Sequence, residues 1–568
     1  MAWKQRNESC KTVSDAVCAL SGLSESELLH PVYTPPQEIQ NLSLAAEAIR
    51  EAVQRKENIS VMGDYDADGV TASSILYFAL EKLGTVPYVR LPKRMSEGYG
   101  LNPSIIPEFK PGLLITVDNG IAAHDAIEQA KANGLKVIVL DHHLPQGDLP
   151  SADIIVDPHV EPANNGFEHY CGAGLAYKLA ELLFPCDSQF LTKMQTLATI
   201  GTIADSVPLV GDNRFLVQNG LVTMKKWRSS STAEQSIPAG LIGLLQVADV
   251  YDIDETDIGY KIGPMINAAG RMRDDGAALA FRTLTADSIE RGVLLATELQ
   301  TLNEARKEET AKYEAVIEEV IERDCLAFTQ PMCVFVENMP EGLVGILTGR
   351  IAEKYKTPAF LFTNSSEKGQ LKGSGRSYGD FNLMNLVNAA MPFLVRGGGH
   401  AGAAGISVTE ENYGAMVNAM TEQMQSYELP ETDDVYYDLT VKSSDISHVY
   451  AELQKFAPFG QNVPRPVFQV NDILLSPRGG NTSKRMGKHF EHIKLFGRGF
   501  SIICFGMAEE YVKSGSPLSL DVIGMISQNT FRYSSETQVE AIAIKEHKTD
   551  RKGRPTSLRD ALIRNGTI

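Results

Sequence analysis

Three aspartates on alternate positions, Asp64, Asp66 and Asp68, follow directly after the short apolar run at 59–62. Carboxylates this close together repel one another, so their spacing indicates that a cation lies among them. The apolar run is typical of a buried strand, and the apolar positions within 70–83 are typical of a helix. The aspartates would then lie at the carboxyl end of a strand, where open α/β sheets bind their ligands.

An EF-hand calcium loop and a solvated acidic turn are the two alternatives for this stretch. An EF-hand loop that began at Asp64 would need a glutamate at its twelfth position, which here is Ile75. The segment before the loop is also predicted to be a strand. A solvated turn without function stays open when the stretch is considered alone.

Acidic residues also follow two further apolar runs, at 113–117 and 137–140. The segment 121–133 between them has a helical pattern, and another acid follows the apolar helical segment at 197–204. Strands that alternate with helices predict a doubly wound parallel sheet, in which right-handed crossovers bring the carboxyl ends of the strands to one edge. The additional residues expected at that edge are Asp118, Asp141, His142, His143 and Asp205.

This donor set predicts a metal site. Carboxylates with one or two imidazoles and no thiolate suit Mn²⁺ or Mg²⁺. A pair of adjacent histidines such as His142 and His143 is often incidental on its own. Because the pair is the third member of a repeated pattern of a strand followed by ligand atoms, we interpret it as part of the site.

Four ordered motifs, DYDADG, TVDNG, LDHH and TIAD, resemble the first four motifs of the DHH phosphoesterase superfamily. Three later stretches, at 262–272, 373–376 and 397–405, narrow the resemblance to the RecJ family of single-strand-specific 5′→3′ DNA exonucleases. The resemblance runs from about residue 59 to the end of the sequence, and seven ordered motifs are far more specific than any one of them.

The resemblance implies a site that holds two divalent cations, Mn²⁺ or Mg²⁺. The matching ligand positions are Asp66, Asp68, Asp118, His142 and Asp205, with Asp118 as the bridging ligand. Asp64 is a further candidate ligand, and His143 is either a ligand or a contact to the scissile phosphate. Asp141 would orient a histidine by a hydrogen bond without binding the metal itself. The positions that match phosphate-binding residues of the family are Arg271, Ser374, Arg376 and His400.

The activity implied is the hydrolysis of single-stranded DNA in the 5′→3′ direction to mononucleotides, in DNA repair and recombination. The expected partners are single-stranded DNA, a single-strand-binding protein and a RecQ-type helicase, and the expected state is a monomer. Two alternatives remain. One is a DHH phosphodiesterase or pyrophosphatase for short oligonucleotides, cyclic dinucleotides or pyrophosphate, and the other is a non-catalytic replisome scaffold of the same fold.

The composition bounds these possibilities. A length of 568 residues implies several domains. There is no apolar run long enough to span a membrane and no apolar signal-peptide core at the N-terminus. The seven scattered cysteines include no C-x-x-C pair, which favours a reducing, cytoplasmic compartment and argues against zinc. The net charge of −18 is unusual for a nucleic-acid-binding protein, so any DNA contact must be locally basic.

We therefore expect an α/β protein of several parts. The predicted parts are an N-terminal arm (1–57), a DHH catalytic domain with a doubly wound parallel sheet (58–283), a connecting helix (284–329), a smaller α/β DHH-associated substrate-binding domain (330–429), an OB-fold β-barrel (430–548) and a basic tail (549–568). Within them, Arg271 is expected after a glycine-rich turn. The glycine-rich stretch around His400 is expected to form a turn whose N–H groups approach a phosphate.

The predicted barrel contains a locally basic stretch. Six basic residues against the single acid Glu491 give the segment 478–498 a charge of +5, and Phe490 and Phe496 lie among them as candidate stacking rings. The basic residues are Arg478, Lys484, Arg485, Lys488, Lys494 and Arg498. We predict that Lys484, Arg485, Lys488 and Phe490 contact single-stranded DNA, with a plain solvated hairpin as the alternative.

Overall fold

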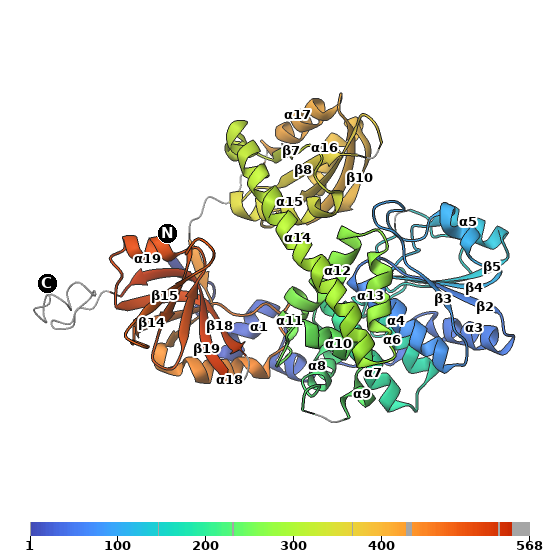
Figure 1. The fold of residues 1–568 in the computed structure, drawn as a ribbon, viewed down its shortest axis with the longest axis horizontal. Coiled ribbons are helices and arrows are strands. Elements are labelled where there is room, and N and C mark those ends of the chain that lie inside the picture. The colour runs from blue at the N-terminus through green and yellow to red at the C-terminus, as the bar shows by residue number, and fades with distance from the viewer. Residues whose placement is uncertain are drawn as a thin grey trace, which may run out of the picture.

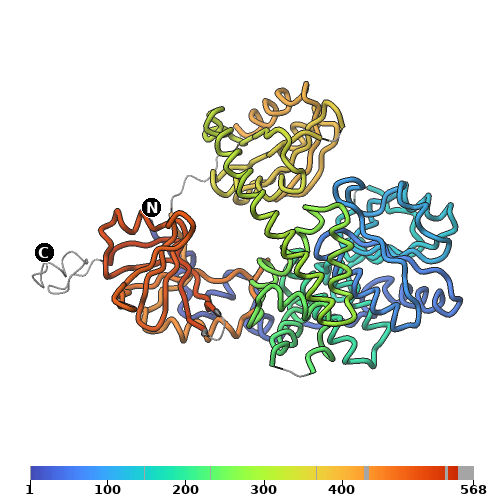
Figure 2. The backbone as a smooth tube through the Cα atoms, in the orientation of Figure 1, coloured from blue at the N-terminus to red at the C-terminus, as the bar shows by residue number. Residues whose placement is uncertain are grey.

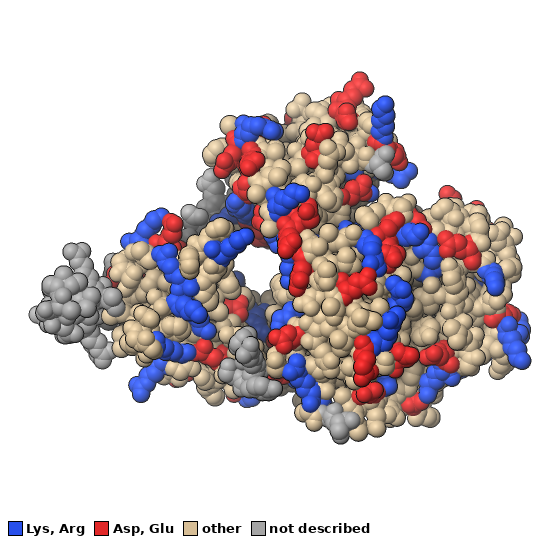
Figure 3. Space-filling view, viewed as in Figure 1, with Lys and Arg blue, Asp and Glu red and all other residues tan. Residues whose placement is uncertain are grey.

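A computed structural model describes residues 2–145, 147–229, 232–365, 367–425, 427, 434–531 and 534–547. The chain forms three bodies, with an N-terminal α/β body, a smaller α/β body and a β-rich body arranged around an opening that passes through the molecule (Figures 1 and 3). The predicted basic tail at 549–568 lies outside the described residues. No described helix has the length and apolar character that a membrane crossing requires.

The first body contains the predicted parallel sheet, in the order β3-β2-β4-β5-β6. All neighbouring pairs in it are parallel, which confirms the doubly wound α/β class. The strands are β2 (Asn58–Met62), β3 (Tyr88–Arg90), β4 (Gly112–Val117), β5 (Leu135–Leu140) and β6 (Ile154–Val156). The helices packed on the sheet or close to it are α3 (Leu42–Gln54), α4 (Ala67–Lys82), α5 (His124–Ala132) and α6 (Gly172–Leu183). The strands are apolar and largely buried because helices cover both faces of the sheet.

A helical layer completes this body and leads out of it. It consists of α7 (Ser188–Ala204), α8 (Gly211–Met224), α9 (Ala233–Ser236), α10 (Ala239–Val247), α11 (Glu255–Asp257), a π-helical turn (Ile258–Ile262), α12 (Gly263–Met272) and α13 (Gly276–Leu284). The long helix α14 (Ile289–Arg323) then runs from this layer to the second body, as predicted for a connecting helix (Figure 2).

The second body is a five-stranded sheet in the order β10-β11-β9-β8-β7. Its strands are β7 (Met332–Phe335), β8 (Ala359–Asn364), β9 (Gln370–Arg376), β10 (Leu394–His400) and β11 (Ala403–Thr409), and its helices are α15 (Glu341–Tyr355), α16 (Met384–Ala390) and α17 (Tyr413–Met424). The glycine-rich stretch was expected to be a turn. It forms most of the β10–β11 hairpin instead, because its alternating backbone pairing continues through the glycines.

The third body is a seven-stranded sheet in the order β13-β14-β18-β19-β17-β16-β15. Its strands are β13 (Leu439–Lys442), β14 (Phe468–Leu474), β15 (Ser483–Met486), β16 (His492–Phe496), β17 (Ser501–Cys504), β18 (Ser519–Phe531) and β19 (Ser534–Glu546). Helices α18 (Ile446–Lys455) and α19 (Ala508–Lys513) accompany the sheet.

Residues 2–30, the first part of the predicted N-terminal arm, pack with the third body. Strand β1 (Trp3–Gln5) pairs with β12 (Val435–Tyr437), and α1 (Val13–Ser21) and α2 (Glu25–Leu29) contribute to the same hydrophobic core. The N-terminal segment lies beside the C-terminal sheet in Figure 2. Arg214 of α8 fastens this assembly to the first body, since its guanidinium donates to the carbonyl oxygens of Leu28, Phe456 and Pro458 at 2.6–2.8 Å.

Candidate metal centre and phosphate cleft

Backbone hydrogen bonds hold two of the three aspartates in the turn after β2. Asp66 caps α4, and its Oδ1 accepts from the N–H groups of Asp68 and Gly69 at 3.0 and 3.1 Å. The carboxylate of Asp68 accepts from the first two N–H groups of α6, Gly172 at 2.6 Å and Ala173 at 2.9 Å. Both carboxylates are thus placed by helix N-termini, where negative charge is favourable.

The imidazole of His142 lies among three carboxylates from three elements. Its Nε2 is 3.0 Å from Oδ1 of Asp118, 3.7 Å from Oδ2 of Asp205 and 3.8 Å from Oδ2 of Asp68. Asp118 follows β4 in a left-handed conformation (φ 61°), and Asp205 caps the C-terminus of α7. The sheet edge therefore does bring the sequence-predicted donors together.

Asp141 forms hydrogen bonds with both histidines. Its Oδ1 lies 2.8 Å from Nδ1 of His143 and accepts from the backbone N–H of His142 at 2.8 Å, while its Oδ2 accepts from the N–H of Ile121 at 2.9 Å. The hydroxyl of Tyr99 donates to the Asp118 carbonyl at 3.0 Å and lies 3.2 Å from Nδ1 of His143. Sequence reasoning missed Tyr99, because its loop follows a strand without an acidic signal.

Burial and mutual repulsion shift the pKa values of this cluster. Burial, together with neighbouring carboxylates, raises the pKa values of Asp64, Asp118 and Asp205 well above the ordinary range. Burial also lowers the pKa of His142 to about 4, which favours the neutral imidazole that can bind a metal. For His143, burial lowers the pKa but the hydrogen bond and charge of Asp141 outweigh it and raise the pKa to about 9.

The residues present fit divalent cations. Ligand atoms lie within 4.8 Å of one another in three groups: Asp64–Asp66–Asp118, Asp68–His142–Asp205 and Asp118–His142–His143. Oδ1 of Asp64 is buried and has no hydrogen-bond partner among the described residues, as expected for an atom reserved for a cation. Oxygen donors with one or two imidazoles and no thiolate suit Mn²⁺ or Mg²⁺.

Two arginines from different bodies meet at the first turn of α15. The guanidinium of Arg271, on α12, donates to the carbonyl of Gly342 at 3.0 Å. Arg376, at the end of β9, lies against Gly345 and within 3.3 Å of the Ser374 hydroxyl. Arg271 was expected after a glycine-rich turn; it occupies the last turn of a helix instead, because the sequence from Gly263 to Met272 continues as α12.

Further arginines surround this pair. Arg94 lies 4.5 Å from the centre of the Tyr65 ring, and burial followed by repulsion from Arg94 lowers the pKa of Arg271 to about 10. Arg306, on α14, is half-buried and repelled by Arg350. Among the described residues, Arg94, Arg271, Arg306 and Arg376 form no ion pair with a carboxylate, so their charge is available to an anion. Sequence reasoning missed Arg94 and Arg306.

The two clusters are joined through α12. Oδ1 of Asn267 on α12 accepts from the N–H of Ala67, which lies within the aspartate turn, at 2.8 Å. His400 lies farther out, exposed at the end of β10. It pairs with Ala403, which in turn pairs with Arg376, so two strand spacings (~10 Å) separate His400 from Arg376.

Comparison with known proteins decides the family. The description "DHH family, N-terminal domain" fits residues 58–202, "DHHA1 domain" fits 329–426 and "RecJ OB domain" fits 437–543. The single-stranded-DNA-specific exonuclease RecJ of Escherichia coli is 31% identical over 473 residues, which cover 78% of this chain and 80% of that protein. The chain belongs to the RecJ family.

Other RecJ proteins agree. The exonuclease RecJ of Bacillus subtilis is 31% identical over 519 residues, 89% of this chain, and the chain spans 63% of that relative's length. The crystal structure of RecJ from Thermus thermophilus in complex with Mn²⁺ is 26% identical with a TM-score of 0.75, covering 97% of this chain and 79% of that one. The third body is thus the RecJ OB domain, and the OB-fold prediction is confirmed.

The basic stretch of the OB domain divides into two parts. Arg478 and Lys494 form ion pairs with Glu536, and Arg478 also lies over the Phe496 ring, so these four residues stabilise the OB domain. The other basic side chains, Lys484, Arg485, Lys488 and Arg498, are exposed. Phe490 is 61% exposed and Phe505, which sequence reasoning missed, is 56% exposed, so both rings are accessible for stacking.

Proposed function

We propose that this chain is an exonuclease that hydrolyses single-stranded DNA from its 5′ end and releases mononucleotides, using two divalent cations. The observation that carries the proposal is the joining of two clusters through α12. One is a buried carboxylate–imidazole cluster that fits Mn²⁺ or Mg²⁺, and the other is a set of arginines without carboxylate partners among the described residues. A phosphodiester that lies between the two clusters would be hydrolysed at the carboxylate–imidazole cluster, while the arginines bind its neighbouring phosphates.

The proposed roles follow from the geometry. Asp66, Asp68, Asp118, His142 and Asp205 would hold the cations, with Asp64 as a further ligand. Asp118 would be shared, since it belongs to both the Asp64–Asp66 group and the His142 group. Bound cations would supply Lewis-acid activation of the attacking water and neutralise charge on the phosphate.

His143 differs from His142 in what it can do. Burial lowers the pKa of His143 in the metal-free protein, but the hydrogen bond and charge of Asp141 outweigh it and raise the pKa to about 9; Asp141 also fixes the orientation of the imidazole. A carboxylate held in this way favours the charged, hydrogen-bond-donating form of the imidazole, so we assign His143 to contact the scissile phosphate. Asp141 acts as the residue that positions it.

The arginine cluster supports recognition of the strand. Arg271, Arg376 and the Ser374 hydroxyl would bind phosphate oxygens, and Arg94 and Arg306 would add to the positive potential. His400 would contact a phosphate farther along the strand, because it lies ~10 Å from Arg376 across the sheet. The OB domain would bind the strand through Lys484, Arg485, Lys488 and Phe490.

Partners and compartment are part of the proposal. A single-strand-binding protein and a RecQ-type helicase would supply single strands, and the chain would act as a monomer in the cytoplasm, in DNA repair and recombination. All seven cysteines are free of disulfides, which supports a reducing compartment.

Digestion assays test the proposal. Single strands and blunt duplexes of the same sequence are incubated with Mn²⁺, Mg²⁺ or EDTA. We expect mononucleotides from single strands with either metal and no hydrolysis with EDTA or of duplexes. Equal hydrolysis of duplexes, or activity confined to dinucleotides, would replace the proposal with that of a small-substrate phosphodiesterase.

A further inference from the structure

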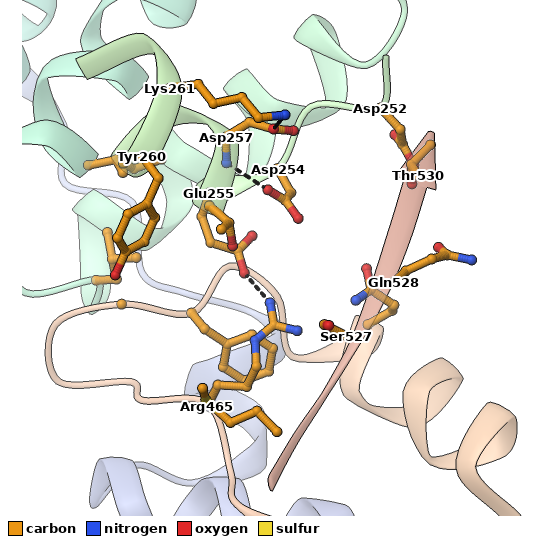
Figure 4. A pocket seen from close by; sticks show the side chains of 18 of the residues that line it. Asp252, Asp254, Glu255, Asp257, Tyr260, Lys261, Arg465, Ser527, Gln528 and Thr530 are labelled. Carbon is orange, nitrogen blue, oxygen red and sulfur yellow. Dashed lines mark hydrogen bonds and ion pairs between the residues drawn. The ribbon is translucent and has the colours of Figure 1, made fainter. Parts of the chain in front are cut away.

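A cavity lies away from the phosphate cleft, between the helical layer and the OB domain (Figure 4). Its volume is about 790 Å³. One wall is the segment 249–261, which includes α11 and the π-helical turn, and the opposite wall is the end of β18 from Met525 to Thr530. Neither wall belongs to the residues assigned to the DNA.

The β18 wall is an open strand edge. Strand β14 pairs with β18 only from Ser519 to Gly524, whereas β19 pairs along the other side for the full length of β18. The carbonyl of Ile526 accepts from Arg465 at 3.3 Å, so it faces away from β19. Because backbone direction alternates along an antiparallel strand, the peptide groups of Gln528 and Thr530 face the same way.

These outward peptide groups are unpaired. No hydrogen bond joins the backbone N–H or C=O of Gln528 or Thr530 to another described residue on that side. Both residues line the cavity, and Figure 4 shows them along its β18 wall. An open edge of this kind is a template on which an extended peptide can add as a strand.

The cavity is strongly acidic. Six acidic and two basic side chains line it, a net formal charge of −4. The acids are Asp249, Asp252, Asp254, Glu255, Asp257 and Glu540, and the bases are Lys261 and Arg465. Both bases are already in ion pairs, Lys261 with Asp257 at 2.7 Å and Arg465 with Glu255 at 2.8 Å. Nucleic acid is repelled here, and a basic ligand is attracted.

We propose that this cavity is a docking site for an extended, lysine- or arginine-rich segment of a partner protein, which adds to the open edge of β18. Main-chain hydrogen bonds to Gln528 and Thr530 hold the segment, and Asp252 and Asp254 on the facing wall select its basic side chains. Ala204 and Ser206, which precede and follow Asp205 in the sequence, also line this cavity.

Proline at position 528 provides a sharp test. Gln528→Pro removes one outward N–H and no backbone hydrogen bond to β19, and proline is tolerated at an open edge. It also removes the side-chain hydrogen bond from Gln528 to Ser535 of β19, and the control Gln528→Ala removes that bond as well. The probe is a short fluorescent peptide of alternating lysine and threonine, titrated into the full chain and followed by anisotropy. We expect Gln528→Pro to weaken binding about tenfold or more, and Gln528→Ala, which keeps the N–H, to change binding by less than about twofold.

Charge variants provide a second test that leaves the edge intact. Asp252→Asn/Asp254→Asn should weaken binding of the lysine peptide about tenfold, because it removes two negative charges that face the peptide. The fold should be kept, since asparagine at 254 can still cap α11. The matched control, Glu308→Gln/Glu319→Gln on the exposed face of α14, removes the same charge and should leave binding unchanged. A peptide with glutamate in place of lysine should not bind the wild-type chain.

Three outcomes would overturn the inference. In the first, the edge variant and the charge variant bind the lysine peptide like wild type. In the second, the control pair on α14 weakens peptide binding as much as the Asp252/Asp254 pair does, which would mean non-specific attraction to an acidic protein. The third concerns the chain's own residues 548–568, which carry six basic and two acidic side chains. If replacing those basic residues by serine tightens peptide binding about tenfold, the cavity serves this tail rather than a partner.

Discussion

Replacing Asp118 by asparagine should stabilise the metal-free protein and remove its response to metal. In the group with Asp64 and Asp66, the carboxylate oxygens lie within 4.8 Å, so each pair of ionised carboxylates would cost about 3.5 kcal/mol or more at an effective dielectric constant of 20. The metal-free folded protein avoids this repulsion only by keeping a carboxyl group protonated. Asparagine removes this repulsion and keeps an oxygen that can accept from His142. In wild type, a cation at one hundred times its dissociation constant contributes about 2.7 kcal/mol per site.

The sign of the pH dependence follows from the raised pKa of Asp118. The unfolded chain ionises this aspartate above its ordinary pKa while the folded protein does not, so wild-type stability falls as the pH rises through that interval. The advantage of Asp118→Asn in EDTA should therefore be absent near pH 4 and largest at pH 8.

Thermal unfolding measures both effects. In EDTA at pH 8 the variant should unfold at a higher temperature than wild type, whereas with saturating Mn²⁺ wild type should gain several degrees and the variant much less. Glu128→Gln, an exposed acid on α5, is the matched control and should behave like wild type. A variant that is less stable than wild type in EDTA at pH 8, or that keeps the full Mn²⁺ shift, would refute the reasoning.

Four further predictions concern other parts of the molecule. Arg376→Met should weaken binding of single strands about tenfold or more with unchanged Mn²⁺ stoichiometry by calorimetry, because charge-assisted hydrogen bonds contribute about 1.5–3 kcal/mol; altered stoichiometry would contradict its role. Arg214→Met should lower the free energy of unfolding by about 3–5 kcal/mol in denaturant titrations, since it removes three buried hydrogen bonds and leaves the carbonyls of Phe456 and Pro458 without a donor among the described residues; a loss under ~1 kcal/mol would contradict this. Asp157→Asn should stabilise the protein in EDTA by up to about 4 kcal/mol at pH 8 and not at pH 4, because burial raises the pKa of Asp157 from 3.8 to about 7; a stability difference that does not grow with pH would contradict it. Lys484→Glu/Arg485→Glu should flatten the salt dependence of binding to long strands and leave hydrolysis of very short oligonucleotides unchanged, whereas an unchanged salt slope would remove these residues from the DNA contact.

The metal centre was predictable because its signals are local. Each candidate ligand follows an apolar segment, and the rule that parallel strands end at one edge brings together Asp66, Asp118 and His142 without further information. The same logic could have found Asp157, which follows β6 at this edge and has a buried Oδ2 without a partner among the described residues. It was missed because the short apolar run at 154–156 is not followed by any of the recognised motifs.

The rest depends on contacts between distant segments. The pairing of Trp3 with Val435 joins residues more than four hundred positions apart, and nothing in the local pattern of either segment predicts it. The glycines before His400 fit a hairpin as well as a turn, so only the pairing with β11 decides between them. Arg306 is half-buried and repelled by Arg350 of α15 in the second body, which a helical pattern alone does not show.

The release of label from single strands tests the central claim most directly. One strand is labelled at the 5′ end and the same strand at the 3′ end, and both are followed with Mn²⁺ over time. The account predicts that the 5′ label appears at once as a mononucleotide, while the 3′ label stays in long, steadily shortening products until late in the reaction. Early release of the 3′ label, or internal fragments that carry either label, would contradict it.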